Sequence, residues 1–141
     1  MLAFYSIRKL IDAAKVATAT RTMEIAVEQY PWKGKPVTRL NWHKLDELYD
    51  FDAEVAARIP LQRICNQMVH SYVFAMAHSD SGGLGGFLFV SDRDKHRHLH
   101  VLDIDEAIAL FEHVGRDYPN ELRMVLNSKT GDYDVTAVTH R

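Results

Sequence analysis

The sequence predicts an α+β fold, in which a helical bundle at residues 1–80 precedes a small portion built as β-hairpin, helix and β-hairpin at residues 81–141. Two observations lead to this prediction. Through much of the first 80 residues the apolar side chains recur at the spacing of amphipathic helices. After a glycine-rich stretch, short runs of aromatic and branched residues are typical of strands. We expect the two portions to pack together as one domain.

The N-terminal segment predicts a first helix over residues 2–17. Its apolar side chains recur at helical spacing and basic residues lie between them. Residues 23–30 look helical again, so the sequence favours one long or kinked helix. This helix must end before Pro31, because a residue that precedes proline leaves the α region.

Two short helices are predicted next. Asn41 can cap the first of them, which runs through Tyr49. Asp52 can cap the second, at residues 53–58. Together with the helix that follows, these segments supply the material for a bundle.

The central helix of the predicted bundle runs from Pro60 to Ala77, and proline suits its first turn. At about 100° per residue, one broad face is apolar and indicates a core helix. That face consists of Leu61, Ile64, Cys65, Met68, Val69, Tyr72 and Met76. The other side carries Arg63, Asn66, Gln67 and His70, with Phe74 one turn after His70. A phenylalanine on a polar side indicates a surface that meets another helix or a nucleobase.

The glycine-rich stretch at residues 79–86 predicts a flexible hinge out of the central helix. It lacks the flanking strand and Lys-Ser or Lys-Thr pair of a phosphate-binding loop. Residues 87–91 and 97–102 then predict a β-hairpin. Asp103 opens a helix, and Glu106 stands at the spacing of a capping box.

A second β-hairpin is predicted near the end of the chain. Its strands are residues 122–126 and 133–137, with Gly131 at the turn. Pro119 prevents the preceding helix from continuing into it.

Composition excludes several classes of protein. The chain of 141 residues is 47% hydrophobic and 26% charged, which is ordinary for a globular domain. The formal net charge of -2 argues against a general nucleic-acid coat, although the chain up to Lys44 has a basic excess that could attract phosphate. The single cysteine, Cys65, indicates a reducing compartment without a disulfide framework. No signal-peptide pattern or membrane-length apolar run is present, so we expect a cytoplasmic protein that does not bind membranes.

The segment from Arg63 to His70 resembles the Arg-x(4–6)-His signature of the HEPN superfamily, helical domains common in prokaryotic toxins and defence systems. The resemblance implies metal-independent cleavage of RNA with no cofactor. His70 would move the proton, Arg63 would hold the phosphate, and Asn66 would orient either of them. Gln67 and Phe74 would contact the substrate or a second copy.

The same resemblance allows a function without catalysis. Many active members have a polar residue directly after the arginine, and this chain has Ile64. The alternative is therefore a dimerisation or binding module in a regulatory or toxin–antitoxin pair, with an antitoxin or regulatory protein as its partner. In either case we expect a homodimer through the Arg63–His70 side, because a two-fold axis would bring Arg63 of one copy toward His70 of the other.

A third hypothesis is a metal site on the first hairpin. His96, His98 and His100 alternate along one predicted strand, and Asp92 or Asp94 could add an oxygen ligand. The arginines and the lysine among them oppose a cation. A solvent-exposed strand face explains the same pattern, and no metal ligand is assigned.

Overall fold

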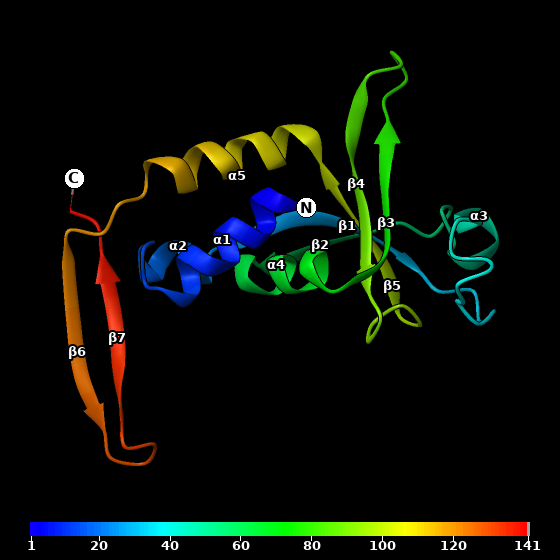
Figure 1. The fold of residues 1–141 in the computed structure, drawn as a ribbon. Helices are drawn as coiled ribbons and strands as arrows, with labels where there is room; N and C mark the ends of the chain where they lie inside the picture. Colours follow the sequence, from blue (N-terminus) through cyan, green and yellow to red (C-terminus); the bar gives the residue numbers. More distant parts are fainter. Residues whose placement is uncertain (141) are drawn as a thin grey trace.

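The centre of the computed structural model, which describes residues 1–140, is a five-stranded antiparallel sheet. Its strands are β1 (Glu24–Pro31), β2 (Val55–Pro60), β3 (Ser71–His78), β4 (Leu84–Ser91) and β5 (His98–Asp103). They lie in the order β2-β1-β5-β4-β3 (Figure 1). Because β1 pairs with β5, strands from the two halves of the chain meet in the middle of one sheet.

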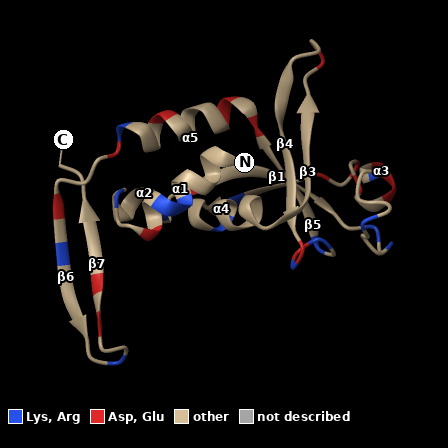
Figure 2. Cartoon of the chain, viewed as in Figure 1, with Lys and Arg blue, Asp and Glu red and all other residues tan. Residues whose placement is uncertain are grey.

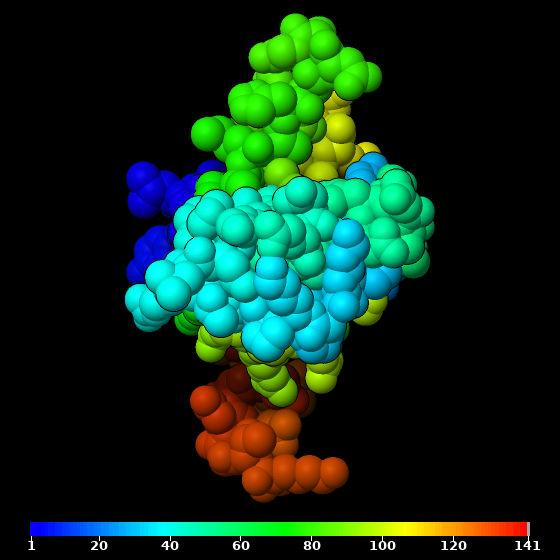
Figure 3. Space-filling model, turned by 90° about the vertical axis from the view of Figure 1, so that its right-hand side faces the viewer, coloured from blue at the N-terminus to red at the C-terminus, as the bar shows by residue number. Residues whose placement is uncertain are grey.

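Helices cover the two faces of this sheet unequally. One side carries α1 (Leu2–Asp12), α2 (Thr18–Thr22), α4 (Leu61–Val69) and α5 (Ile104–Arg116). The short α3 (Leu45–Leu48) lies on the other side (Figure 1). The segment around α3 covers part of that face, and the end of the β3–β4 hairpin projects beyond it (Figure 3).

Two apolar clusters hold these layers together. On the side of α1, α4 and α5, the apolar faces of the helices pack on β1, β2, β4 and β5; its fully buried members include Leu61, Ile64, Cys65, Met68, Phe89 and Leu102. On the other side Leu48 and Tyr49 pack on strand residues such as Val73 and Leu99. The second cluster covers only the part of its face formed by β3, β4 and β5, and residues of β2 such as Val55 stay exposed. The helices pack on the sheet and not on one another as a bundle.

The predicted helical bundle at residues 1–80 is wrong, because two of its helices are strands. Residues 23–30 form β1 and residues 53–58 fall largely in β2, which pairs with β1. Burial in β1 alternates, with Ile25 and Val27 buried and Glu24 and Glu28 exposed. This period of two is the signal of a strand. The branched side chains of the segment favour the same conformation.

The predicted central helix is also shorter than expected. It forms α4, ends at Val69, and the chain continues as β3 from Ser71. The aromatic and branched residues at 72–74 favour a strand over a helix. The apolar face that was predicted for the helix is buried as far as Met68, whereas Met76 is exposed on β3.

The second half of the chain follows the prediction more closely. β4 and β5 form the expected antiparallel hairpin. Asp103 caps α5 as predicted. Its carboxylate accepts a hydrogen bond from the backbone N–H of Asp105 at 2.8 Å, and not from Glu106 as in a capping box. The last hairpin is β6 (Glu121–Asn127) and β7 (Asp132–Val138), and Gly131 at its turn has a φ of 73°.

The β6–β7 hairpin forms a sheet of its own. It lies beyond α2 and extends away from the rest of the chain (Figures 1 and 3). None of the helices within the described residues combines the length and the apolar character required to cross a membrane.

Candidate functional site

A cavity of about 800 Å³ opens between α1, α4 and the turn that joins β4 to β5. Its lining is polar and consists of Arg8, Arg63, Asn66, Gln67, His70, Ser91, Asp92, Arg93, Asp94 and Arg97. Among the described residues that line it, the arginines outnumber the aspartates by two, so the cavity carries excess positive charge. We call it the arginine cavity.

Helix α4 supplies one wall of the arginine cavity. Four polar residues of α4 are spaced at helical intervals and lie opposite its apolar face: Arg63, Asn66, Gln67 and His70. His70 is the residue at which the helix ends, and its backbone N–H donates to the carbonyl of Asn66 at 3.0 Å. The structure thus brings four of the five predicted site residues to one cavity within a single chain.

The floor of the cavity holds a buried carboxylate. Asp94 accepts a hydrogen bond from Nε2 of Gln67, while Oε1 of Gln67 accepts from the backbone N–H of Ser91 at 2.8 Å. Arg63 Nη2 lies 3.8 Å from Asp94 Oδ2, and Arg97 Nη1 lies 3.9 Å from Oδ1. Gln67 is therefore buried in a hydrogen-bond network, whereas the sequence predicted that it would contact the substrate or a second copy.

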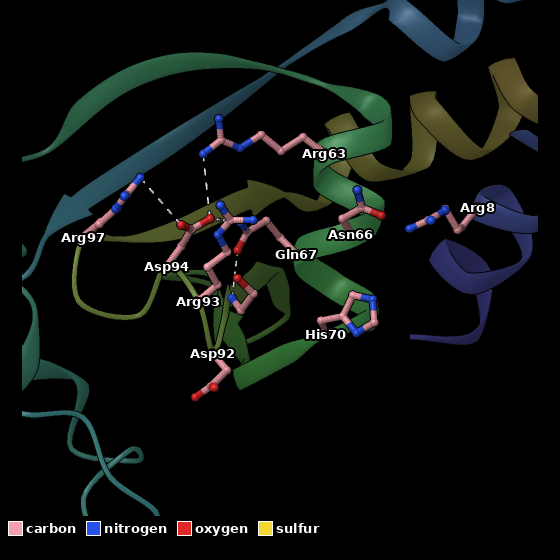
Figure 4. Close-up of a pocket in the computed structure, with 10 residues that line it drawn as sticks. Arg8, Arg63, Asn66, Gln67, His70, Asp92, Arg93, Asp94 and Arg97 are labelled. Atoms are coloured by element: carbon pink, nitrogen blue, oxygen red, sulfur yellow. Dashed lines mark hydrogen bonds and ion pairs between the residues drawn. The ribbon is translucent and has the colours of Figure 1, made fainter. Parts of the chain in front are cut away.

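The cavity has two ends with different chemistry (Figure 4). At one end Arg63 and Arg97 flank Asp94. At the other end Asn66 and His70 point toward α1, from which Arg8 extends. Arg8 is oriented by Asp12, whose Oδ1 lies 3.1 Å from its Nε. Along α4, Arg63 and His70 are separated by about 10 Å of helical rise.

One polar atom in this region has no partner within the described residues. Oδ1 of Asn66 is buried and accepts no hydrogen bond from the part of the chain that the structure describes. A buried carbonyl oxygen of this kind is costly unless it accepts a hydrogen bond. Asn66 therefore offers an acceptor beside His70.

Phe74 is not part of this cavity. It lies on β3, where its ring stacks on Phe87 with centroids 6.0 Å apart and packs against the core. The site prediction placed Phe74 on the polar side of a helix that does not extend so far. The strand conformation of residues 71–78 removes it from the Arg63–His70 side.

The three histidines of the first hairpin do not lie on one strand, because only His98 and His100 belong to β5. His96 precedes β5, and its Nε2 accepts from the backbone N–H of Val37 at 3.1 Å. His100 is only 3% exposed, and burial together with the nearby Arg63 cation lowers its pKa to about 4. Its Nδ1 lies 3.3 Å from Nε2 of Gln29. Residues 1–140 contain no cluster of three or more His, Cys, Asp or Glu side chains that could hold a metal ion.

Several cavity residues were not identified from the sequence. Arg93 was assigned to the turn of the first hairpin and Arg97 to its returning strand, while Asp94 was considered only as a metal ligand. Arg8 was counted in the general basic excess of the N-terminal segment. The helical period on α4 could locate only residues on the same helix. The signal that could have found the others is the density of arginine and aspartate in a turn between two strands.

The chain matches no family model, no curated protein and no solved structure in the three comparisons. The resemblance of Arg63–His70 to the HEPN signature is therefore untested by these comparisons.

Proposed function

We propose that this protein binds the phosphate backbone of RNA in the arginine cavity and cleaves it there without a metal ion. The observation that carries the proposal is the convergence of Arg8, Arg63, Arg93 and Arg97 with His70 on one polar cavity. Guanidinium groups bind phosphate oxygens with charge-assisted hydrogen bonds, and histidine exchanges protons near neutral pH.

The shape of the cavity favours a strand over a single phosphate ion. Arg8 lies at the end of the cavity that holds His70, and Arg63 and Arg97 lie at the other end (Figure 4). An extended cavity with cations at both ends suits successive phosphates of one chain. The net charge of the protein is slightly negative, so this local excess directs the polymer to the cavity rather than to the whole surface.

The reaction that fits these groups is transesterification within the RNA. His70 takes the proton of a ribose 2′-hydroxyl while O2′ bonds to the adjacent phosphorus. The bond from phosphorus to the 5′ oxygen then breaks, and the imidazolium returns the proton to that oxygen. The products are a 2′,3′-cyclic phosphate and a 5′-hydroxyl. Arginine offsets the charge that develops on the phosphorus centre, and Asn66 would orient the His70 imidazole from within the cavity wall.

The test is to incubate the purified protein with single-stranded RNA of mixed sequence in the presence of EDTA. We expect cleavage with 2′,3′-cyclic phosphate ends, and we expect His70→Ala to abolish it. His78→Ala is the matched control, because His78 is exposed on β3 and does not line the cavity. Cleavage that persists in His70→Ala, or that requires a divalent metal, would contradict the catalytic role.

A second candidate is an RNA-binding module without catalysis, acting in a regulatory or toxin–antitoxin pair. It is favoured by the observation that His70 is the one histidine among the described residues that line the cavity. Cleavage needs both a proton acceptor and a donor, and many ribonucleases divide these roles between two groups. Tight binding that depends on the arginines, with no cleavage under any condition, would select this candidate.

A further inference from the structure

The strand register divides the β6–β7 hairpin into two unlike faces. Residues that pair directly across an antiparallel ladder lie on the same face, and successive residues alternate between faces. The pairs Leu122–Ala137, Met124–Val135 and Leu126–Tyr133 share one face. We call these six residues the hairpin apolar face. The opposite face carries the charged residues of the hairpin strands, among them Arg123 and Asp134.

Most of the hairpin apolar face is open to solvent. Met124 is 61% exposed, and Leu122, Leu126 and Tyr133 are each more than half exposed. At its base Ala137 is buried beside α2, where its backbone N–H donates to Oγ1 of Thr18 at 3.0 Å. Beyond this point no described element of the chain covers the face.

An open apolar face on this hairpin is physically unfavourable for an isolated chain. A two-stranded hairpin is marginally stable in water unless a third strand or another layer covers its apolar side. A contiguous apolar patch on a soluble protein marks an interaction surface. Figure 2 shows acidic and basic residues along β6 and β7 as well. The strand register places these charged residues on the face opposite the hairpin apolar face.

We propose that the hairpin apolar face is the contact between two copies of this chain, which pack hairpin on hairpin about a two-fold axis. The face carries no charged residue, so like charges do not oppose its contact with itself. It also offers no charge that would select an oppositely charged partner.

The order of side chains on β6 supports an antiparallel two-fold contact. On the hairpin apolar face, β6 contributes Leu122, Met124 and Leu126. The order of residue types, leucine, methionine, leucine, is the same in both directions along the strand. An axis at Met124 places Met124 against Met124 of the partner copy, and each Leu122 against a Leu126. The antiparallel arrangement also keeps the two bodies at opposite ends of the contact, because each hairpin joins its body at one end (Figure 1).

The size of the face sets the expected affinity. A strand of seven residues is about 23 Å long, and two strands give a face about 10 Å wide. This contact is smaller than the roughly 800 Å² per partner of a standard interface. We therefore expect a dimer with a dissociation constant in the micromolar range, distinct from any pairing through the arginine cavity.

Sedimentation of the full chain over a micromolar concentration series tests the proposal. The mass should rise from 16.2 kDa toward twice that value as concentration increases. Met124→Glu should hold the protein at the monomer mass. Val125→Glu is the control, because Val125 is the next residue on the same strand, is 66% exposed, and lies on the opposite face. Its dissociation constant should stay within about twofold of the wild type.

A cysteine cross-link provides an independent measurement if Met124→Glu does not fold. Under mild oxidation Met124→Cys should form a disulfide-linked dimer and Val125→Cys should not. The native Cys65 is buried and does not compete. A wild-type chain that stays monomeric through the series, equal loss of dimer in both glutamate variants, equal cross-linking at both positions, or growth into larger assemblies would each overturn the proposal.

Discussion

At the scale of single residues, the arginine cavity depends on one buried carboxylate. Asp94 is 8% exposed, accepts a hydrogen bond from Gln67 of α4, and forms long ion pairs with Arg63 and Arg97. A buried charge is tolerated only when it is paired and hydrogen-bonded. The same contacts hold the two arginines over the cavity, so Asp94 links the stability of the fold to the arrangement of its cations.

Gln67→Leu should destabilise the protein by about 1–3 kcal/mol, because it leaves the Asp94 carboxylate and the Ser91 backbone N–H without a buried partner. Urea denaturation measures this change in the free energy of unfolding. Gln62→Leu on the same helix is the control, since Gln62 lies outside the network and should change stability by less than about 0.5 kcal/mol. Equal effects of the two substitutions would show that the network is not stabilising.

The lowered pKa of His100 makes the free energy of unfolding depend on pH. Its pKa is lowered to about 4 in the folded chain, chiefly by burial and then by Arg63 and His98, from an ordinary value of 6.5. Between these two values the unfolded chain binds the proton and the folded chain does not. The contribution of His100 is therefore fully present above pH 6.5 and is lost as the pH falls toward 4, by about 3 kcal/mol at most.

Thermal unfolding at pH 7 and pH 4.5 measures this contribution. We expect the melting temperature of His100→Gln to fall less between the two pH values than that of the wild type, because glutamine does not titrate. His78→Gln, at an exposed position, should keep the wild-type dependence. The interpretation fails if His100→Gln and the wild type lose the same stability on acidification.

At the scale of elements, the sequence predicted those segments whose signals are local. Asp103 at the start of α5 and Gly131 in the last turn lie where the sequence placed them. The apolar period of α4 was also correct as far as Met68, and it placed Arg63 and His70 on the side opposite the core. The helical interpretation failed in β1 and β3, where few residues are available and both periods fit a short apolar run.

The close pairing of β4 and β5 depends on Gly86. A Cβ atom at this position would lie 2.5 Å from the carbonyl oxygen of Leu102. Gly86→Ala should therefore destabilise the protein by about 1–3 kcal/mol through overpacking. Gly115→Ala is the matched control, because nothing lies within 4 Å of its Cβ position in α5. It should stabilise the protein by about 0.5–1 kcal/mol. Urea denaturation of both variants measures these changes in the free energy of unfolding. If Gly86→Ala leaves the free energy of unfolding unchanged, the close pairing of β4 and β5 at Gly86 is refuted.

At the scale of the whole molecule, the architecture follows from contacts that no local pattern reveals. The pairing of β1 with β5 joins residues about 70 positions apart, and it converts the N-terminal half from a bundle into part of a sheet. The same long-range packing brings Arg8, Arg93 and Arg97 to the cavity from outside α4. For this reason the sequence could predict the α4 side of the site but not the cavity itself.

The central claim is that the arginine cavity binds the RNA backbone. The most direct measurement is the RNA affinity of Arg63→Gln as a function of salt concentration, with Arg116→Gln as the control. Both arginines lie on helices, are exposed, and form long ion pairs of 3.8 and 3.6 Å, but Arg116 lies on α5 outside the cavity. We expect fluorescence anisotropy with single-stranded RNA to show about tenfold weaker binding for Arg63→Gln, with a salt slope reduced by about 1. Arg116→Gln should bind as the wild type does. Equal binding by the two variants, or no binding by the wild type, would contradict the claim.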